Sequence, residues 1–130
     1  MTSNRILQLN ATATALCGVA MLAARGILPP LFGLDRPVLL DALAIGLLAY
    51  AAMLALAASR PTVTRQALLA FTVADAVWVA ASALVLLEFW TEFAAVARLL
   101  VIAVALVVEV FATLQFRAAG RVVSGTRQIA

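Results

Sequence analysis

Four long apolar runs limit the folds open to this chain more than any other feature. They cover about residues 6–24, 38–58, 66–87 and 93–116, are rich in alanine, leucine and valine, and contain no proline. About 20 apolar residues in a helix cross the ~30 Å hydrocarbon core of a membrane. Because backbone polar groups in lipid must be paired within their own segment, each run is predicted to be a membrane-spanning helix.

The composition agrees with a membrane protein. Of the 130 residues, 66% are apolar and 12% are charged, whereas soluble domains are nearer half apolar and a quarter charged. We predict an all-α integral membrane bundle of four helices that alternate up and down, within a single domain over residues 1–116. Residues 117–130 are polar and are predicted to form a mobile cytoplasmic tail. Gln8 and Asn10 interrupt the first run, which is therefore expected to remain uncleaved rather than act as a signal peptide.

The basic residues are nine arginines, without lysine or histidine. With four spans, the termini and the second loop share one side, which would hold Arg5, Arg60, Arg65, Arg117, Arg121 and Arg127. The other side would hold two or three arginines, so both termini are predicted to be cytoplasmic. Arginine without lysine, together with many alanines, is typical of GC-rich bacterial genomes and indicates a bacterial inner membrane. The arginines form no patch with interleaved aromatic residues, so no nucleic-acid partner is expected.

Several kinds of chemistry are excluded by missing residue types. Without histidine there is no His-ligated haem, no His/Cys zinc site and no His-containing catalytic triad. Cys17 is the only cysteine, so the chain can form no internal disulfide and no cysteine-based metal site. No metal, no cofactor and no catalytic residue is predicted, and an enzymatic role is the less favoured one.

The connections between the runs carry clear signals. Proline and glycine in the apolar first loop prevent residues 27–34 from forming one helix, so this loop is expected to cap the bundle or to act as a lid. Thr64 is expected to cap the third helix.

Two acidic residues lie deep inside the predicted spans. By helical rise, Asp75 is ~13 Å into the third run and Glu109 is ~10 Å from the end of the fourth. An ionisable side chain at the centre of a span costs about 2.5 to 3.5 kcal/mol, so it normally faces protein or water. Because the two helices run in opposite directions, both carboxyls are expected at a similar depth.

Polar residues at helical spacing extend both positions into stripes. We predict one polar cluster that binds a ligand or a proton and consists of Asn10, Thr14, Asp75, Glu109 and Thr113, with Trp78 as an aromatic wall. Two nearby carboxyls can share a proton and titrate as a pair, which suits a proton or cation relay or a polar head group. Alternatively, the acids only hold helices together, through contacts of about 0.6 to 2 kcal/mol.

A second pair of charges is expected at the other end of the bundle. Arg98 lies near the start of the fourth run and Asp41 near the start of the second, so the two are predicted to form a structural ion pair. Arg25, Asp35 and Glu88 are alternative partners.

Two families of small four-helix membrane proteins do not fit. Small multidrug transporters carry an essential carboxylate in the first helix, where this chain has only Asn10 and threonines. Small fluoride channels carry glycine-rich and Phe/Thr/Ser-rich motifs that are absent here. The size and four-span layout are similar to those of the DoxX-like group of bacterial membrane proteins, from which no functional residue is carried over.

Three classes of function remain open. The first is a proton-linked transporter or small-molecule binder that uses Asp75 and Glu109 as a carboxyl pair. The second is a structural or accessory subunit of a membrane complex. The third is an intramembrane enzyme that acts on a lipid or quinone with a carboxyl as general acid. The expected partners are the lipid bilayer and either a second copy or a larger membrane complex.

Overall fold

The computed structural model describes residues 1–129 and the side chains of residues 1–122, and in this part of the chain all secondary structure is helical. The helices are α1 (Ser3–Ala23), α2 (Leu28–Leu31), α3 (Val38–Ala58), α4 (Arg65–Glu88) and α5 (Ala95–Ile129). All but α2 are long and apolar enough to span a membrane, as the four runs predict. In α5 the candidate span is Ala95–Val122.

Local signals account for where the helices start. The Thr64 side chain accepts a hydrogen bond from Ala67 N at 3.1 Å, which confirms the predicted N-cap of α4. Thr2 plays the same part for α1, where its hydroxyl accepts from Arg5 N at 3.2 Å.

The last helix is longer than predicted. It does not end at Phe116 but continues through the segment expected to be a polar tail, and Ala130 lies outside the described residues. The physical reason lies in two small residues, Ala118 and Ala119, which are buried at 0% and 1% exposure. They give the polar segment one apolar face that packs against the first residues of α1, so the helix is stabilised beyond the apolar run.

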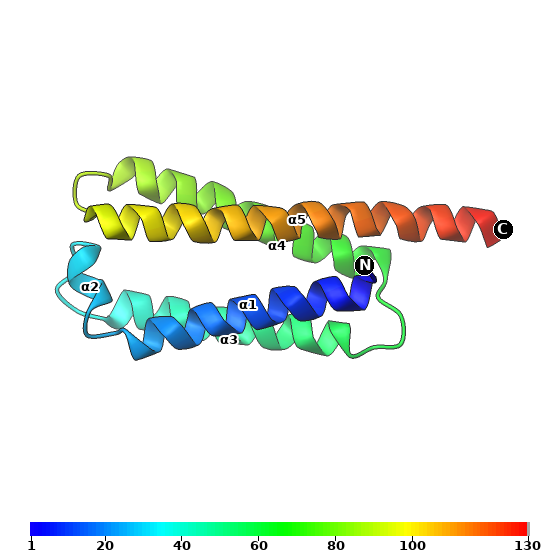
Figure 1. Cartoon of the computed structure of the whole chain (residues 1–130), viewed down its shortest axis with the longest axis horizontal. Coiled ribbons are helices and arrows are strands. Elements are labelled where there is room, and N and C mark those ends of the chain that lie inside the picture. Colours follow the sequence, from blue (N-terminus) through cyan, green and yellow to red (C-terminus); the bar gives the residue numbers. More distant parts are fainter. Residues whose placement is uncertain (130) are drawn as a thin grey trace.

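The four long helices form two antiparallel pairs. Figure 1 shows α1 beside α3 in one layer and α4 beside α5 in the other, with both chain termini at the same end of the molecule. We call this the terminal end. Packing is extensive within each pair, and far fewer contacts join one pair to the other. Gly18 allows the close approach within the first pair, because an added Cβ there would lie 3.0 Å from Ala44 O.

The apolar core lies at the terminal end. It is formed by residues from both pairs, namely Ile6, Leu7, Ala11, Leu54, Ala58, Val63, Leu68, Ala118 and Ala119. Asn4 locks the same end, because its side-chain amide donates to Ala58 O and Arg60 O, both at 2.8 Å. The core residues therefore hold the two pairs together at this end, whereas the Asn4 hydrogen bonds join α1 to the end of α3 within one pair.

At the opposite end, α2 forms a cap. The backbone N–H of Ala94 donates to Leu31 O at 2.8 Å, and the rings of Phe32 and Phe93 meet edge to face at 5.0 Å. Gly33 has a φ of 71°, and a Cβ at this position would lie 3.1 Å from Glu92 O. The loop after α2 therefore needs glycine, both for its left-handed backbone and for its close approach to the α4–α5 loop.

Candidate functional site

Directly next to the apolar core, the two helix pairs meet through five polar side chains. This polar cluster consists of Asn10 from α1, Thr14 from α1, Tyr50 from α3, Asp75 from α4 and Gln115 from α5. By helical rise its members lie about 10 to 17 Å from the terminal end of each candidate span. Asn10, Asp75 and Gln115 are buried at 2%, 3% and 0% exposure.

Asp75 is the centre of the cluster. Its Oδ2 accepts hydrogen bonds from Asn10 Nδ2 at 3.0 Å and from Gln115 Nε2 at 2.9 Å. Its Oδ1 accepts from the Tyr50 hydroxyl at 2.9 Å. One side chain from each of α1, α3 and α5 thus donates a hydrogen bond to this carboxyl group, and each donor is neutral.

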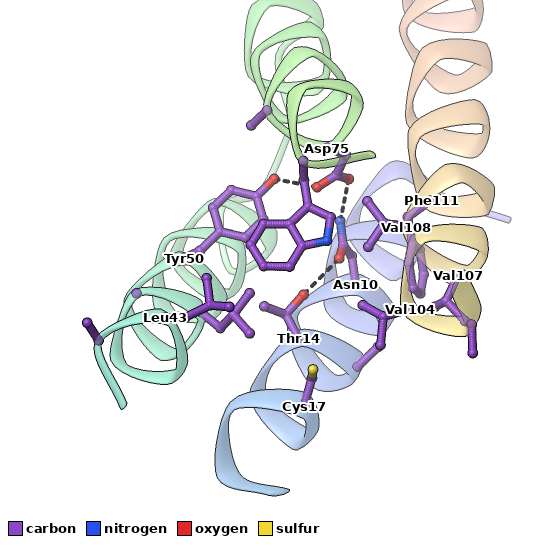
Figure 2. Close-up of a pocket in the computed structure, with 17 residues that line it drawn as sticks. Asn10, Thr14, Cys17, Leu43, Tyr50, Asp75, Val104, Val107, Val108 and Phe111 are labelled. Carbon is purple, nitrogen blue, oxygen red and sulfur yellow. Dashed lines mark hydrogen bonds between the residues drawn. The ribbon is translucent and has the colours of Figure 1, made fainter. Parts of the chain in front are cut away.

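The amides are held in one consistent orientation. Asn10 Nδ2 also donates to Gln115 Oε1 at 2.7 Å, and Asn10 Oδ1 accepts from the Thr14 hydroxyl at 3.1 Å. Figure 2 shows the Asn10 side chain between Asp75 and Thr14, with Tyr50 reaching Asp75 from α3. Each of the two amide groups therefore both donates and accepts a hydrogen bond inside the cluster.

A cavity opens beside the cluster, between the two helix pairs. This cluster cavity has a volume of about 510 Å³, which is in the range of small-molecule sites. Asn10, Thr14, Tyr50 and Asp75 supply its polar wall, whereas most other lining residues are aliphatic. The aliphatic and aromatic part of the wall includes Leu43, Val104, Val107, Val108 and Phe111 (Figure 2).

A second cavity adjoins the first toward α2. This cap cavity has a volume of about 630 Å³ and is lined almost wholly by apolar side chains. The cavities share five wall residues, namely Cys17, Leu43, Leu47, Trp78 and Val104. Together they extend from a polar end at Asp75 to an apolar end under Phe32 and Phe93.

Trp78 stands in the wall between the two cavities. Its Nε1 is buried, and no described group accepts its hydrogen bond. A buried N–H without an acceptor costs about 1 to 3 kcal/mol. A polar ligand atom or a water molecule in the cavity would remove this cost.

The predicted pair of carboxyls is not formed. Glu109 is exposed on the outside of α5, and no hydrogen bond or ion pair links its carboxyl to Asp75 or to another described side chain. Thr113 is exposed beside it, and its hydroxyl donates to the Glu109 backbone oxygen at 3.0 Å. The other predicted members, Asn10, Thr14, Asp75 and Trp78, do come together around one cavity.

The reason is the rotation of α5. Its buried side is a stripe of small and apolar residues that includes Gln115, and Gln115 follows Glu109 by six positions. Six positions correspond to about 120° around a helix, so the two side chains cannot share a face. The structure therefore places Gln115 where Glu109 was expected.

The predicted ion pair between Arg98 and Asp41 is also wrong. Asp41 instead pairs with Arg25, its alternative partner, through Nη2–Oδ2 at 2.7 Å and Nε–Oδ1 at 3.4 Å. This pairing follows from the close packing of α1 against α3, which brings the end of one helix beside the start of the other. Arg98 donates from Nε to Trp90 O at 2.8 Å, and its guanidinium lies 4.4 Å from the centre of the Trp90 ring.

Two members of the cluster were not expected from the sequence. Tyr50 reads as a packing contact, since a single tyrosine in an apolar run gives no sign of its partner. Gln115 lies next to Phe116 and Arg117, where the apolar run ends, so its position in the sequence does not indicate a buried side chain. The usable signal was that Asn10, Asp75 and Gln115 lie at similar distances from the terminal end.

Comparison with protein-family models, with curated proteins and with solved structures finds no match for this chain. The site is therefore interpreted from its own chemistry.

Proposed function

We propose that this protein binds a small amphiphilic molecule within the membrane, between its two helix pairs. The polar group of the ligand lies against Asp75 and Trp78 in the cluster cavity, and its apolar part extends into the cap cavity. The proposal rests chiefly on Trp78 Nε1, a buried donor without a partner in the wall shared by both cavities. The proposal keeps the binder hypothesis from the sequence but assigns the site to Asp75 without Glu109.

The shape of the space supports a ligand with two unlike ends. Small-molecule sites are mostly apolar and contain a few convergent polar groups. Here the polar groups lie at one end, around Asp75, and the rings of Phe32 and Phe93 lie at the other. A molecule that partitions into lipid would match this gradient.

Intrinsic fluorescence can test the proposal. The chain has two tryptophans, so Trp90→Phe leaves Trp78 as the only tryptophan, whose emission is excited selectively above the tyrosine absorption band. In lipid nanodiscs, 11-bromoundecanol is expected to quench Trp78 along a saturating curve, because bromine quenches on contact. Gly46→Phe should raise the half-saturating concentration about tenfold or more. Gly46 lines the cluster cavity, and an added Cβ there meets nothing within 4 Å.

Ala52→Phe is the matched control, because Ala52 is exposed on the same helix and lines neither cavity. It should leave the curve unchanged. Quenching that rises linearly with the probe and is equal in all variants would mean simple partitioning into the bilayer, and the binder proposal would then fail.

One observation favours a second candidate function, that of a subunit in a membrane complex. Glu109 lies 14 residues after Ala95 and 13 before Val122, in the middle of the candidate span, and it faces outward. Ionisable residues within a membrane nearly always face protein or water. A neighbouring protein chain on this face of α5 would provide such surroundings.

The arginine distribution supports a bacterial inner-membrane location with both termini in the cytoplasm. Arg5 lies near the start of α1 and Arg65 at the start of α4. Arg60 lies in the loop between α3 and α4, and Arg117 and Arg121 lie in the last two turns of the α5 span. A C-terminal green fluorescent protein fusion is expected to fluoresce in intact bacteria, and the matching alkaline phosphatase fusion is expected to be inactive. The reverse pattern would show that the C-terminus lies outside the cytoplasm, contrary to the proposed orientation.

A further inference from the structure

We infer that the ligand of this cavity is a lipophilic organic cation, whose charged group lies beside Asp75. The inference rests on the proposed function and names its ligand class. It depends on three features of the site: the Asp75 carboxyl without a basic partner, the aromatic rings around it, and the apolar space beyond.

The first feature is a carboxylate without a countercharge. Every hydrogen bond that reaches Asp75 is donated to it, by Asn10 and Gln115 at Oδ2 and by Tyr50 at Oδ1. All three donors are neutral, so no described basic side chain offsets the charge of the ionised carboxyl. No arginine takes part, and the one ion pair among the described residues joins Arg25 to Asp41.

An ionised carboxyl with only neutral donors carries an uncompensated charge, and burying such a charge is unfavourable. A cation in the cluster cavity would offset that charge at short range, because Asp75 itself forms part of the wall. An anionic ligand would add a second negative charge in the same low-dielectric space.

The second feature is a set of aromatic side chains. Tyr50, Trp78 and Phe111 line the same cavity as Asp75. The face of an aromatic ring attracts cations, and tryptophan does so most strongly. Carboxylate and aromatic groups together are the usual surroundings of organic ammonium groups in proteins.

The third feature is the apolar space beyond Asp75, which favours an organic cation over an inorganic one. No group of three or more potential metal-binding side chains occurs among the described residues. Apart from Asn10, Thr14 and Cys17, the rest of the wall is aliphatic, and Asn10 Oδ1 already accepts from the Thr14 hydroxyl. Too few free oxygen atoms remain to replace the hydration shell of a small inorganic ion. The hydrocarbon part of an organic cation would fill this space favourably.

Trp78 offers a further contact that a ligand can use but that binding of a cation does not need. Its unpaired Nε1 is a donor, which a bare cationic group cannot satisfy. An amphiphilic amine that carries a hydroxyl, ether or carbonyl oxygen near its charged group would bind both Asp75 and Trp78.

Binding of two isosteric probes of opposite charge tests the inference. Radiolabelled tetraphenylphosphonium and tetraphenylborate are measured separately on the purified protein in nanodiscs of zwitterionic lipid, with empty nanodiscs as background. We expect saturable binding of tetraphenylphosphonium and no specific binding of tetraphenylborate. This contrast in the wild-type protein does not depend on any variant.

Two neutralising substitutions locate the charge. Asp75→Asn is expected to weaken binding of tetraphenylphosphonium at least about tenfold. Glu109→Gln is the matched control, because it removes a carboxyl that lies in the same membrane segment but outside the cavity, and it should leave binding unchanged. If the two probes bind equally, or if Asp75→Asn binds the cation as well as wild type, the cation inference is overturned.

The result with 11-bromoundecanol distinguishes the proposed binding of an amphiphile from the inference that this ligand is a cation. Saturable quenching by this neutral alcohol, without cation binding, would leave the amphiphile proposal standing and refute the ligand class. Failure of all three probes would refute both.

Discussion

Replacing Asp75 with leucine is expected to destabilise the folded protein by about 2 to 5 kcal/mol. The substitution removes one acceptor from three buried or half-buried donors, Asn10, Gln115 and Tyr50. Polar contacts between membrane helices contribute about 0.6 to 1.7 kcal/mol each, and all three are lost together. Unfolding in detergent by increasing denaturant, followed by circular dichroism, would measure the change.

An opposing effect makes this prediction informative. Replacing a buried charge by an apolar residue can be neutral or stabilising when its partners are replaced as well. Here the partners remain, and leucine would leave Gln115 Nε2 without an acceptor and Asn10 Nδ2 with only Gln115 Oε1 in an apolar layer. The cost of unmatched donors should therefore exceed the gain from removing the charge.

Asp75→Asn distinguishes these two effects. Its amide oxygen can accept from Asn10 and Gln115, and its NH2 group can donate to the Tyr50 hydroxyl. Tyr50 could then donate to Phe71 O, which lies 3.4 Å away. This variant should lose only about 1 kcal/mol. Ala76→Leu, at an exposed position on the same helix, should be close to wild type. A fully stable Asp75→Leu protein would contradict the view that the cluster holds the helix pairs together.

The helices were predictable because apolar runs in lipid have few structural options. Each run must be helical, so the runs alone gave the four spanning helices, and proline and glycine gave the loops. The end of α5 could not be predicted from the apolar runs. It continues past Phe116 because Ala118 and Ala119 enter the core beside Ile6 and Leu7, which is a tertiary contact without a local signal.

The site was predictable only on helices where the polar residue deepest in the span faces inward. On α1 and α4, Asn10 and Asp75 mark the buried face, so the stripes drawn through them were correct. On α5 the most polar residue of the span, Glu109, faces outward, and the stripe drawn through it was wrong. Hydrophobic periodicity could not correct the choice, because valine and leucine occupy both the buried and the lipid-facing sides of this helix.

That outward position of Glu109 leads to the second large effect. Glu109→Leu is expected to stabilise the isolated protein in lipid by up to about 2.5 to 3.5 kcal/mol, the cost of an ionisable side chain at the centre of a span. No described side chain pairs with the Glu109 carboxyl, so the substitution removes an unfavourable group and breaks no contact between side chains. Glu109→Gln should give a smaller gain, since the amide remains polar.

The same substitution tests whether a partner covers this face of α5. In a complex, the Glu109 carboxyl would be paired with a polar group of the neighbouring chain, and leucine would weaken the association while stabilising the isolated protein. Unfolding of the purified protein, together with its size in mild detergent extracts of native membranes, would measure both effects at once. A stability gain with unchanged size in the extracts would favour a lone binder and oppose the subunit function. A stability loss in the isolated protein would show that the carboxyl already has a partner within the chain, which would contradict its position on the outer face of α5.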